Sequence, residues 1–159
     1  MTTLFPMSEA VFAEYMAKSI PDFAREKVAS GQWSRESALE LSRRGFETLL
    51  PQGLATPDNH IFEIRFETET VGMLWFAVQE RAGQKIAYVY DVMIDPVQQR
   101  KGHGTRAFLA LEDKARTLGL SGIALHVFGH NPDAHALYVR LGFQPTNISM
   151  YKPIGPALP

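Results

Sequence analysis

"IAYVYDVMIDPVQQRKGHGTRA", residues 86–107, joins a nearly continuous apolar run to a glycine-containing loop and to the start of a helix. The apolar run ends before Pro96 and is typical of a strand that is buried on both faces and central in its sheet. Beyond the loop, apolar residues recur at helical spacing over residues 105–118, and Gly119 fits the left-handed position that ends many helices. The stretch therefore predicts a strand, a loop and a helix within an α/β sheet.

Downstream of this stretch the pattern continues with a strand, a helix and a final strand. "GIALHVF", residues 122–128, is a predicted strand. A helix is expected over residues 131–141, with Asn131 as its N-cap. "SMYKPI", residues 149–154, is the predicted last strand. Because helices separate successive strands here, at least one pair of strands should be parallel.

The part of the chain before this stretch predicts helices and then a hairpin. A short extended segment is expected at residues 2–6. Pro21 and Gly31 interrupt the helical spacing of the apolar residues, and three helices are therefore expected, over residues 9–20, 22–30 and 35–50. In "HIFEIRFET" apolar and charged residues alternate as in a strand with one buried face, and "VGMLWFAVQ" follows as the second strand of a hairpin.

Length and composition predict one globular domain, residues 1–159, with 45% hydrophobic and 21% charged residues. The formal net charge of -1 argues against attraction of the whole protein to nucleic acid or to an anionic membrane. No segment approaches the roughly 20 apolar residues of a bilayer span, and the N-terminus lacks a signal-peptide pattern. Cysteine is absent, which excludes disulfides, thiolate metal sites and a Cys nucleophile. We therefore expect a cytoplasmic protein without nucleic-acid or membrane partners.

The loop "QQRKGHGTR", residues 98–106, is compatible with a solvated connector, a nucleic-acid contact or a phosphate-binding site. Glycines let backbone N–H groups approach phosphate oxygens, and the following helix N-terminus adds partial positive charge. No P-loop pattern occurs in the chain. "GHGTRA" satisfies the Gly-x-Gly-x-x-Ala pattern of dinucleotide sites. The long approach from the strand and the missing acidic residue after the next strand argue against a dinucleotide.

Two motifs carry a resemblance to a known family. Gln99, Gly102 and Gly104 form Gln-x-x-Gly-x-Gly, which resembles the acetyl-CoA pyrophosphate loop of the GNAT N-acetyltransferase superfamily. "HNPDAHALYVRLGF" is similar to that family's Asn-x-x-Ala-x-x-x-Tyr-x-x-x-Gly-Phe helix, through Asn131, Ala134, Tyr138, Gly142 and Phe143. The resemblance covers about residues 86–143. It implies an α/β fold with a mixed, mostly antiparallel central sheet of about six or seven strands and helices on both faces.

The resemblance also implies acetyl-CoA as cosubstrate and assigns roles to residues. Val92, Met93 and Ile94 would pair their backbone with the pantetheine arm, and the Val92 amide would polarise the thioester carbonyl. Tyr138 would be the general acid for the departing thiolate, in a direct transfer to an amine without a covalent enzyme intermediate. Contacts to CoA would come from Gln99, Arg100, Lys101, Gly102, His103, Gly104, Thr105 and Asn131.

The general base stays open at this level. Family members often carry a carboxylate early on the corresponding strand, where this chain has Ile86 and Tyr88. Asp91 is one candidate, since an acid within so apolar a run needs a polar partner. His126 is another, because its ordinary pKa suits proton transfer near neutral pH. A structural role for either residue, or a base that acts through water, is equally compatible with the sequence.

The sequence says less about partners and about cofactors other than acetyl-CoA. The spacing of the histidines at 126, 130 and 135 does not match a zinc motif, and no metal is expected. The acceptor is expected to be an amine on a small molecule or a peptide. Acidic residues before position 30 could attract a cationic amine or simply form a solvated helix face. A non-catalytic acyl-CoA-binding or sensor module remains the alternative function, and a homodimer is compatible with the sequence.

Overall fold

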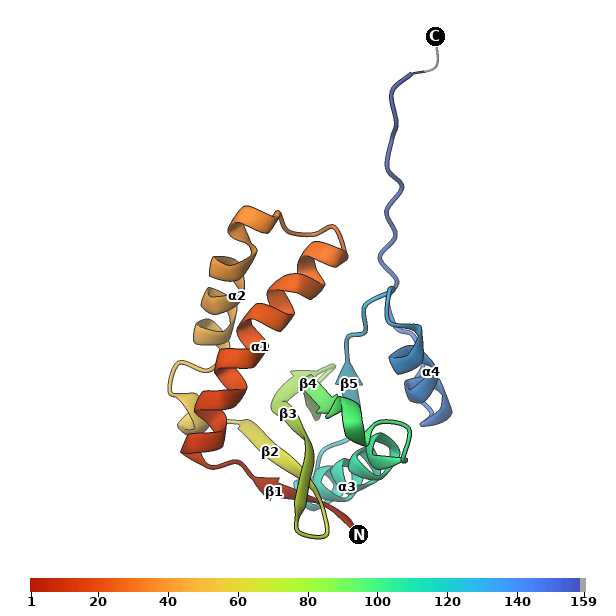
Figure 1. The fold of residues 1–159 in the computed structure, drawn as a ribbon. Coiled ribbons are helices and arrows are strands. Elements are labelled where there is room, and N and C mark those ends of the chain that lie inside the picture. Colours follow the sequence, from red (N-terminus) through yellow and green to blue (C-terminus); the bar gives the residue numbers. More distant parts are fainter. Residues whose placement is uncertain (158–159) are drawn as a thin grey trace.

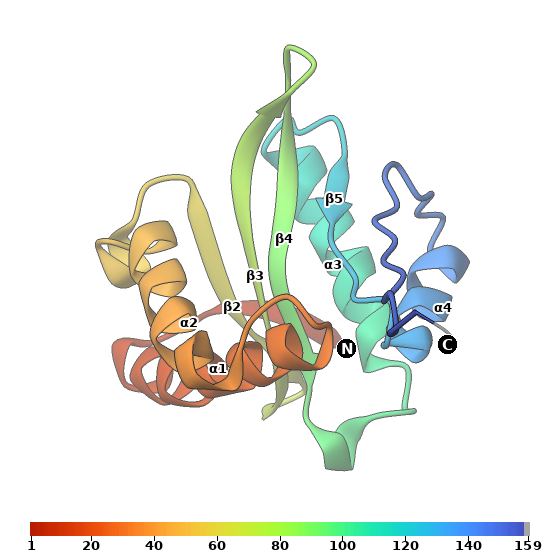
Figure 2. The same cartoon turned by 90° about the horizontal axis from the view of Figure 1, so that it is seen from above.

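The computed structural model describes residues 1–157 as a five-stranded sheet with helices on both faces (Figures 1 and 2). The strands are β1 (Thr2–Pro6), β2 (Asn59–Phe66), β3 (Glu69–Arg81), β4 (Gln84–Ile94) and β5 (Ile123–Leu125). The helices are α1 (Glu9–Ala29), α2 (Arg35–Leu49), α3 (His103–Thr117) and α4 (Pro132–Arg140), with short 3-10 turns η1 (Gly53–Ala55) and η2 (Pro96–Gln98). No helix within residues 1–157 is long and apolar enough to span a membrane.

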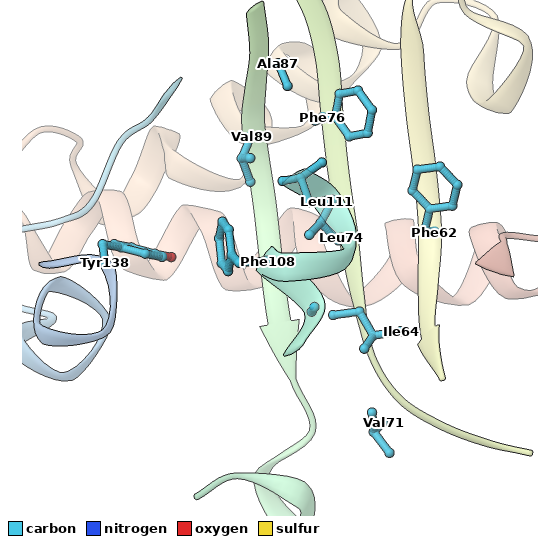
Figure 3. Close-up of a cluster of buried hydrophobic side chains, with 11 residues drawn as sticks. Phe62, Ile64, Val71, Leu74, Phe76, Ala87, Val89, Phe108, Leu111 and Tyr138 are labelled. Carbon is cyan, nitrogen blue, oxygen red and sulfur yellow. The ribbon is translucent and has the colours of Figure 1, made fainter. Parts of the chain in front are cut away.

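The sheet order is β1-β2-β3-β4-β5, and only β4 and β5 are parallel. The expected mostly antiparallel α/β sheet with helices on both faces is therefore confirmed, with five strands instead of six or seven. Successive residues of the central strands point to opposite faces of the sheet, and each face has its own hydrophobic core. Leu74 and Phe76 of β3 pack with α3 and α4 (Figure 3), whereas Met73 and Trp75 pack beneath α1 and α2.

Helix α1 is continuous through Pro21, so the predicted break between two helices at this residue is wrong. A proline removes its own N–H donor and crowds the preceding turn, but tertiary packing can outweigh that cost. Here α1 packs along α2, and the buried Ser42 hydroxyl of α2 donates a 2.6 Å hydrogen bond to the Ile20 carbonyl. Continuity places residues 15, 19, 23 and 27, spaced four apart, near one face of the helix.

The C-terminal tail, residues 144–157, contains no strand or helix, so the strand predicted over residues 149–154 is absent. The tail is exposed and leads away from the body of the protein (Figure 1). The predicted strand over residues 122–128 is also shorter, since only Ile123–Leu125 pair with β4. A strand requires a neighbour to satisfy its backbone, and the segments beyond these pairs have none in residues 1–157.

A β-bulge interrupts the pairing of β3 with β4. Trp75 pairs with Asp91 whereas the next residue, Phe76, pairs with Val89, which leaves Tyr90 as the extra residue on β4. The bulge reverses the alternation along β4. Val89 and Val92 both belong to the core beneath α3, and Asp91 consequently points toward α1. Without the extra residue, Asp91 would share the apolar face of Val89.

Gly72 marks a close approach between β3 and the end of β4. A Cβ added at Gly72 would lie 2.1 Å from the Met93 carbonyl oxygen, so the backbone would have to move. We expect Gly72→Ala to lower the free energy of unfolding by about 1–3 kcal/mol, measured by urea denaturation. Gly45→Ala is the matched control, because Gly45 lies within α2 with open space around it. That change should raise the free energy of unfolding by about 0.5–1 kcal/mol. Equal effects at the two positions would contradict a specific need for glycine at Gly72.

Candidate active site

A cavity of about 400 Å³ opens where β4 and β5 stop pairing. The two strands pair at only three positions, from Ala87 with Ile123 to Val89 with Leu125. Beyond them the edge of β4 from Tyr90 to Ile94 that faces away from β3 has no strand partner among residues 1–157. The cavity wall comes from α1, β4, the segment after β5, and α4, and includes Phe23, Lys27, Tyr88, Asp91, Val92, His126, Phe128, Asn131, Ala134 and Tyr138.

Asp91 lies at this cavity as a partly buried, hydrogen-bonded carboxylate. The Tyr15 hydroxyl of α1 donates a 2.7 Å hydrogen bond to Asp91 Oδ2, and the Val92 backbone N–H is a second donor. Burial raises the pKa of Asp91, while these two donors act in the opposite direction. Burial also raises the pKa of Tyr15, and the Asp91 charge adds to that effect. Asp91 therefore has the polar partner that an acid in an apolar strand requires.

Tyr138 of α4 reaches into the core beside α3 (Figure 3). Its hydroxyl has no hydrogen-bond partner in the part of the chain that the structure describes. Its ring packs edge-on against Phe108 and Phe143, with centroids 5.5 and 5.7 Å away. Burial raises the pKa of Tyr138 to about 12, and the negative charge of Asp91 contributes to this rise. The phenol thus stays protonated at neutral pH and borders the cavity.

His126 also lines the cavity, in the segment that follows β5. Its ring makes a T-shaped contact with Phe128 at 5.0 Å. Partial removal of water lowers the pKa of His126, and the positive charge of Lys27 lowers it further. The ring is therefore neutral near pH 7 and able to accept a proton. His130 pairs instead with Glu26, and residues 1–157 contain no cluster of three side chains suited to a metal.

The loop between β4 and α3 presents a series of free backbone donors. Arg100 and Gly102 have φ of 64° and 80°, and the N–H groups of residues 100–105 donate no hydrogen bond within residues 1–157. Gln99 ties the loop to β4 through a 3.1 Å bond from Nε2 to the Ile94 carbonyl. Left-handed residues followed by a helix N-terminus turn successive N–H groups toward one side and suit an anion.

Several residues of this loop, which were expected to contact CoA or to add positive charge, make packing contacts and hydrogen bonds within the protein. His103 is 4% exposed and packs on Phe66, with ring centroids 5.1 Å apart. Arg106, the third cation of the loop, donates to the Lys101 carbonyl and to the Thr2 hydroxyl. A Cβ added at Gly104 would lie 3.3 Å from Leu137 Cδ2, so this glycine allows α3 to approach α4.

The structure brings five of the predicted site residues together at one cavity. Asp91, Val92, His126, Asn131 and Tyr138 border one cavity. Asn131 also caps α4, because its Oδ1 accepts a 3.3 Å hydrogen bond from the Ala134 N–H. The remaining predicted positions continue from this cavity along β4 into the loop, at Met93, Ile94, Gln99, Arg100, Lys101, Gly102, His103, Gly104 and Thr105.

Three residues of α1 contribute to the site and were not predicted. Tyr15 holds Asp91, and Phe23 and Lys27 line the cavity. Their spacing of eight and then four residues is the signal that could have identified them. The prediction of a helix end at Pro21 concealed it, because it assigned Tyr15 and Phe23 to separate helices.

Comparisons with known proteins identify similar sequences over most of the chain. A sequence model described as the acetyltransferase (GNAT) family matches residues 22–143. The chain is 37% identical over 150 residues to the uncharacterized N-acetyltransferase YycN of Bacillus subtilis, covering 94% of this chain and 96% of YycN. It is 33% identical over 151 residues to YdgE of the same organism, an uncharacterized N-acetyltransferase, with the same coverage of each chain.

Solved structures show the same fold. The crystal structure of YycN superposes with a TM-score of 0.94 at 36% identity, covering 98% of this chain and 100% of YycN. The structure of AAC(6')-Iy, in complex with the bisubstrate analogue CoA-S-monomethyl-acetylneamine, has a TM-score of 0.62 at 11% identity. That match covers 98% of this chain and 99% of AAC(6')-Iy, and at this identity it supports the fold alone.

Proposed function

The chain belongs to the GNAT acetyltransferase family, and we propose on this basis that it transfers an acetyl group from acetyl-CoA directly to an amine. The observation that carries the proposal is the continuity of three features. The free N–H groups of residues 100–105 adjoin the end of β4, the unpaired edge of β4 follows, and the cavity with Tyr138 lies beside that edge. Residues 1–159 act in this proposal as one domain.

The loop and the strand edge together hold acetyl-CoA. The N–H groups of residues 100–105 bind the pyrophosphate, as their orientation at the α3 N-terminus favours an anion. The backbone of residues 92–94 pairs with the pantetheine arm as an added strand would. Asn131 adds a side-chain contact beyond its role as a helix cap. The CoA-containing analogue bound by AAC(6')-Iy supports the view that this fold accommodates such a ligand.

The transfer requires a proton acceptor for the amine and a proton donor for the leaving thiolate. As the amine attacks the thioester carbon, the C–N bond forms and the C–S bond breaks, giving an amide and free CoA thiol. Tyr138 donates its phenolic proton to the sulfur, and the Val92 N–H donates a hydrogen bond to the carbonyl oxygen as negative charge develops there. Asp91 or His126 accepts the proton of the amine and returns a proton to Tyr138 through solvent.

Tyr15 provides a test of whether Asp91 is the base. Its hydroxyl lowers the pKa of Asp91, so Tyr15→Phe should raise that pKa. A base works only when deprotonated, and the acidic limb of the profile of kcat/KM against pH should therefore move to higher pH. Asp91→Asn should abolish this limb. An acidic limb that persists in Asp91→Asn and does not move in Tyr15→Phe would exclude Asp91 as the base.

The proposed function is tested by measuring thiol release from acetyl-CoA across a panel of small-molecule and peptide amines. We expect CoA to be released in the presence of at least one class of amine and an acetylated amine to form in equal amount. Saturable CoA binding without release across the panel would instead support an acyl-CoA-binding module. A chain that binds no CoA would contradict both functions.

A further inference from the structure

The C-terminal tail exposes an unusual concentration of apolar surface. Ile148, Met150, Tyr151 and Ile154 are between 76% and 94% exposed, although they lie within seven residues of one another. Single apolar side chains are common on protein surfaces, but a contiguous set on an extended segment is typical of an interaction site. This surface therefore requires a partner.

The order of the tail residues favours pairing as a strand. Ile148, Met150 and Ile154 fall on alternate positions, so one face of an extended tail is largely apolar. Backbone N–H and C=O groups between residues 147 and 154 make no hydrogen bonds to other backbone groups within residues 1–157. A segment of this kind is stable when it adds to the edge of an existing sheet.

The sheet offers a matching edge at β5. This strand pairs with β4 on one side, and its other side has no strand partner among residues 1–157. Residues 122–128 carry the apolar pattern of a seven-residue strand, but only three of them pair. Open edges of this kind usually acquire a partner or a cover.

The tail of the same chain does not approach this edge. Phe143 packs on the core, and the chain beyond it leads away from β5 into solvent (Figure 1). Most of the tail nevertheless lies within the 98% of the chain that matches the YycN crystal structure. The occupant of the edge must therefore come from another molecule that carries such a strand, and a second copy of this chain supplies one.

We propose that two copies form a symmetric dimer in which the tail of each copy, residues 147–154, pairs with the free edge of β5 in the other. Reciprocal exchange buries the apolar face of both tails and covers the free edge of β5 in each copy, as a twofold interface allows. The partner's strand then lies beside residues 125–128, which form one wall of the cavity. The proposal does not depend on the transferase activity.

The mass of the protein in solution tests this arrangement. We expect light scattering after gel filtration to give twice the chain mass of 17.8 kDa. A chain that ends at Thr146 should be monomeric. Met150→Asp should raise the dimer dissociation constant about tenfold or more, because it places a charge on the buried face. Ser149→Asp, the same charge on the opposite face of the strand, is the matched control and should leave the dimer intact.

Hydrogen exchange separates the exchanged dimer from a tail that folds back on its own chain. Amides of residues 147–154 should be protected in the dimer and should lose that protection on dilution to monomer. A monomeric full-length chain would overturn the proposal, whether its tail were protected or not. A dimer that persists in both the shortened chain and Met150→Asp would overturn it as well.

Discussion

Replacing Tyr138 with Phe should lower kcat by about 10²- to 10⁴-fold, the usual contribution of a general acid, while leaving the affinity for CoA nearly unchanged. The phenylalanine keeps the edge-on contacts with Phe108 and Phe143 and removes only the hydroxyl. The affinity should hold because the pyrophosphate and pantetheine contacts come from the loop and β4. Steady-state thiol release would measure the loss of turnover, and calorimetric titration with CoA would measure the affinity.

Tyr88→Phe is the matched control for this variant. Tyr88 also borders the cavity, and burial also raises its pKa, but it lies on β4 and has no assigned role in the transfer. Its loss should leave kcat within a few-fold of the wild-type value. Equal turnover in Tyr138→Phe and the wild type would remove Tyr138 from the acid role. An equal loss in the two variants would indicate a general effect of the cavity hydroxyls.

Thr105→Glu should weaken CoA binding by about thirtyfold. Thr105 is exposed at the third position of α3, where Glu favours helix formation and can bond the free N–H groups itself. The added charge repels a pyrophosphate, by about 2 kcal/mol for charges roughly 8 Å apart at an effective dielectric of about 20. The thermal unfolding midpoint should therefore stay equal or rise while the dissociation constant of CoA rises.

Thr105→Gln controls for the size of the new side chain. It should bind CoA almost as the wild type does, and the difference between the two variants should shrink as salt is added. Unchanged CoA affinity in Thr105→Glu would place the pyrophosphate away from the α3 N-terminus. An unfolding midpoint that is equal or higher, together with weaker CoA binding, distinguishes a loss of binding from a loss of folding.

Local signals were sufficient for the loop and for α4. Gly102 occupies a left-handed position directly before α3, and Asn131 caps α4 through its side chain. These assignments depend on residues within a few positions of each other, so the sequence contains the information they require. The family and the mostly antiparallel sheet followed from the same two segments.

Long-range packing decided the features that the sequence did not reveal. Pro21 lies within a continuous α1 because residues before and after it pack against α2 and the sheet. This packing also brings Tyr15 to Asp91. The bulge at Tyr90 depends on the register with β3, which no local pattern in "YVYDVMI" reports. Gly104 serves a contact with Leu137 of α4, a residue more than thirty positions away.

The predicted strand over residues 149–154 shows a different limit. Its alternating apolar residues are those of a strand, but the chain provides no neighbour for it within residues 1–157. A sequence pattern reports that a segment can pair, whereas the presence of a partner depends on topology and assembly. The exchange proposed for the tail reconciles the pattern with the structure.

In the proposed complex, CoA lies along the N–H groups of residues 100–105 and the free edge of β4. The most direct measurement is a titration of the ¹⁵N-labelled full chain with CoA, followed by the shifts of its backbone amides. The account predicts the largest changes at residues 100–105 and 90–94, with smaller changes around Tyr138 and Asn131. Saturable binding that leaves these amides unshifted, or no binding at all, would contradict it.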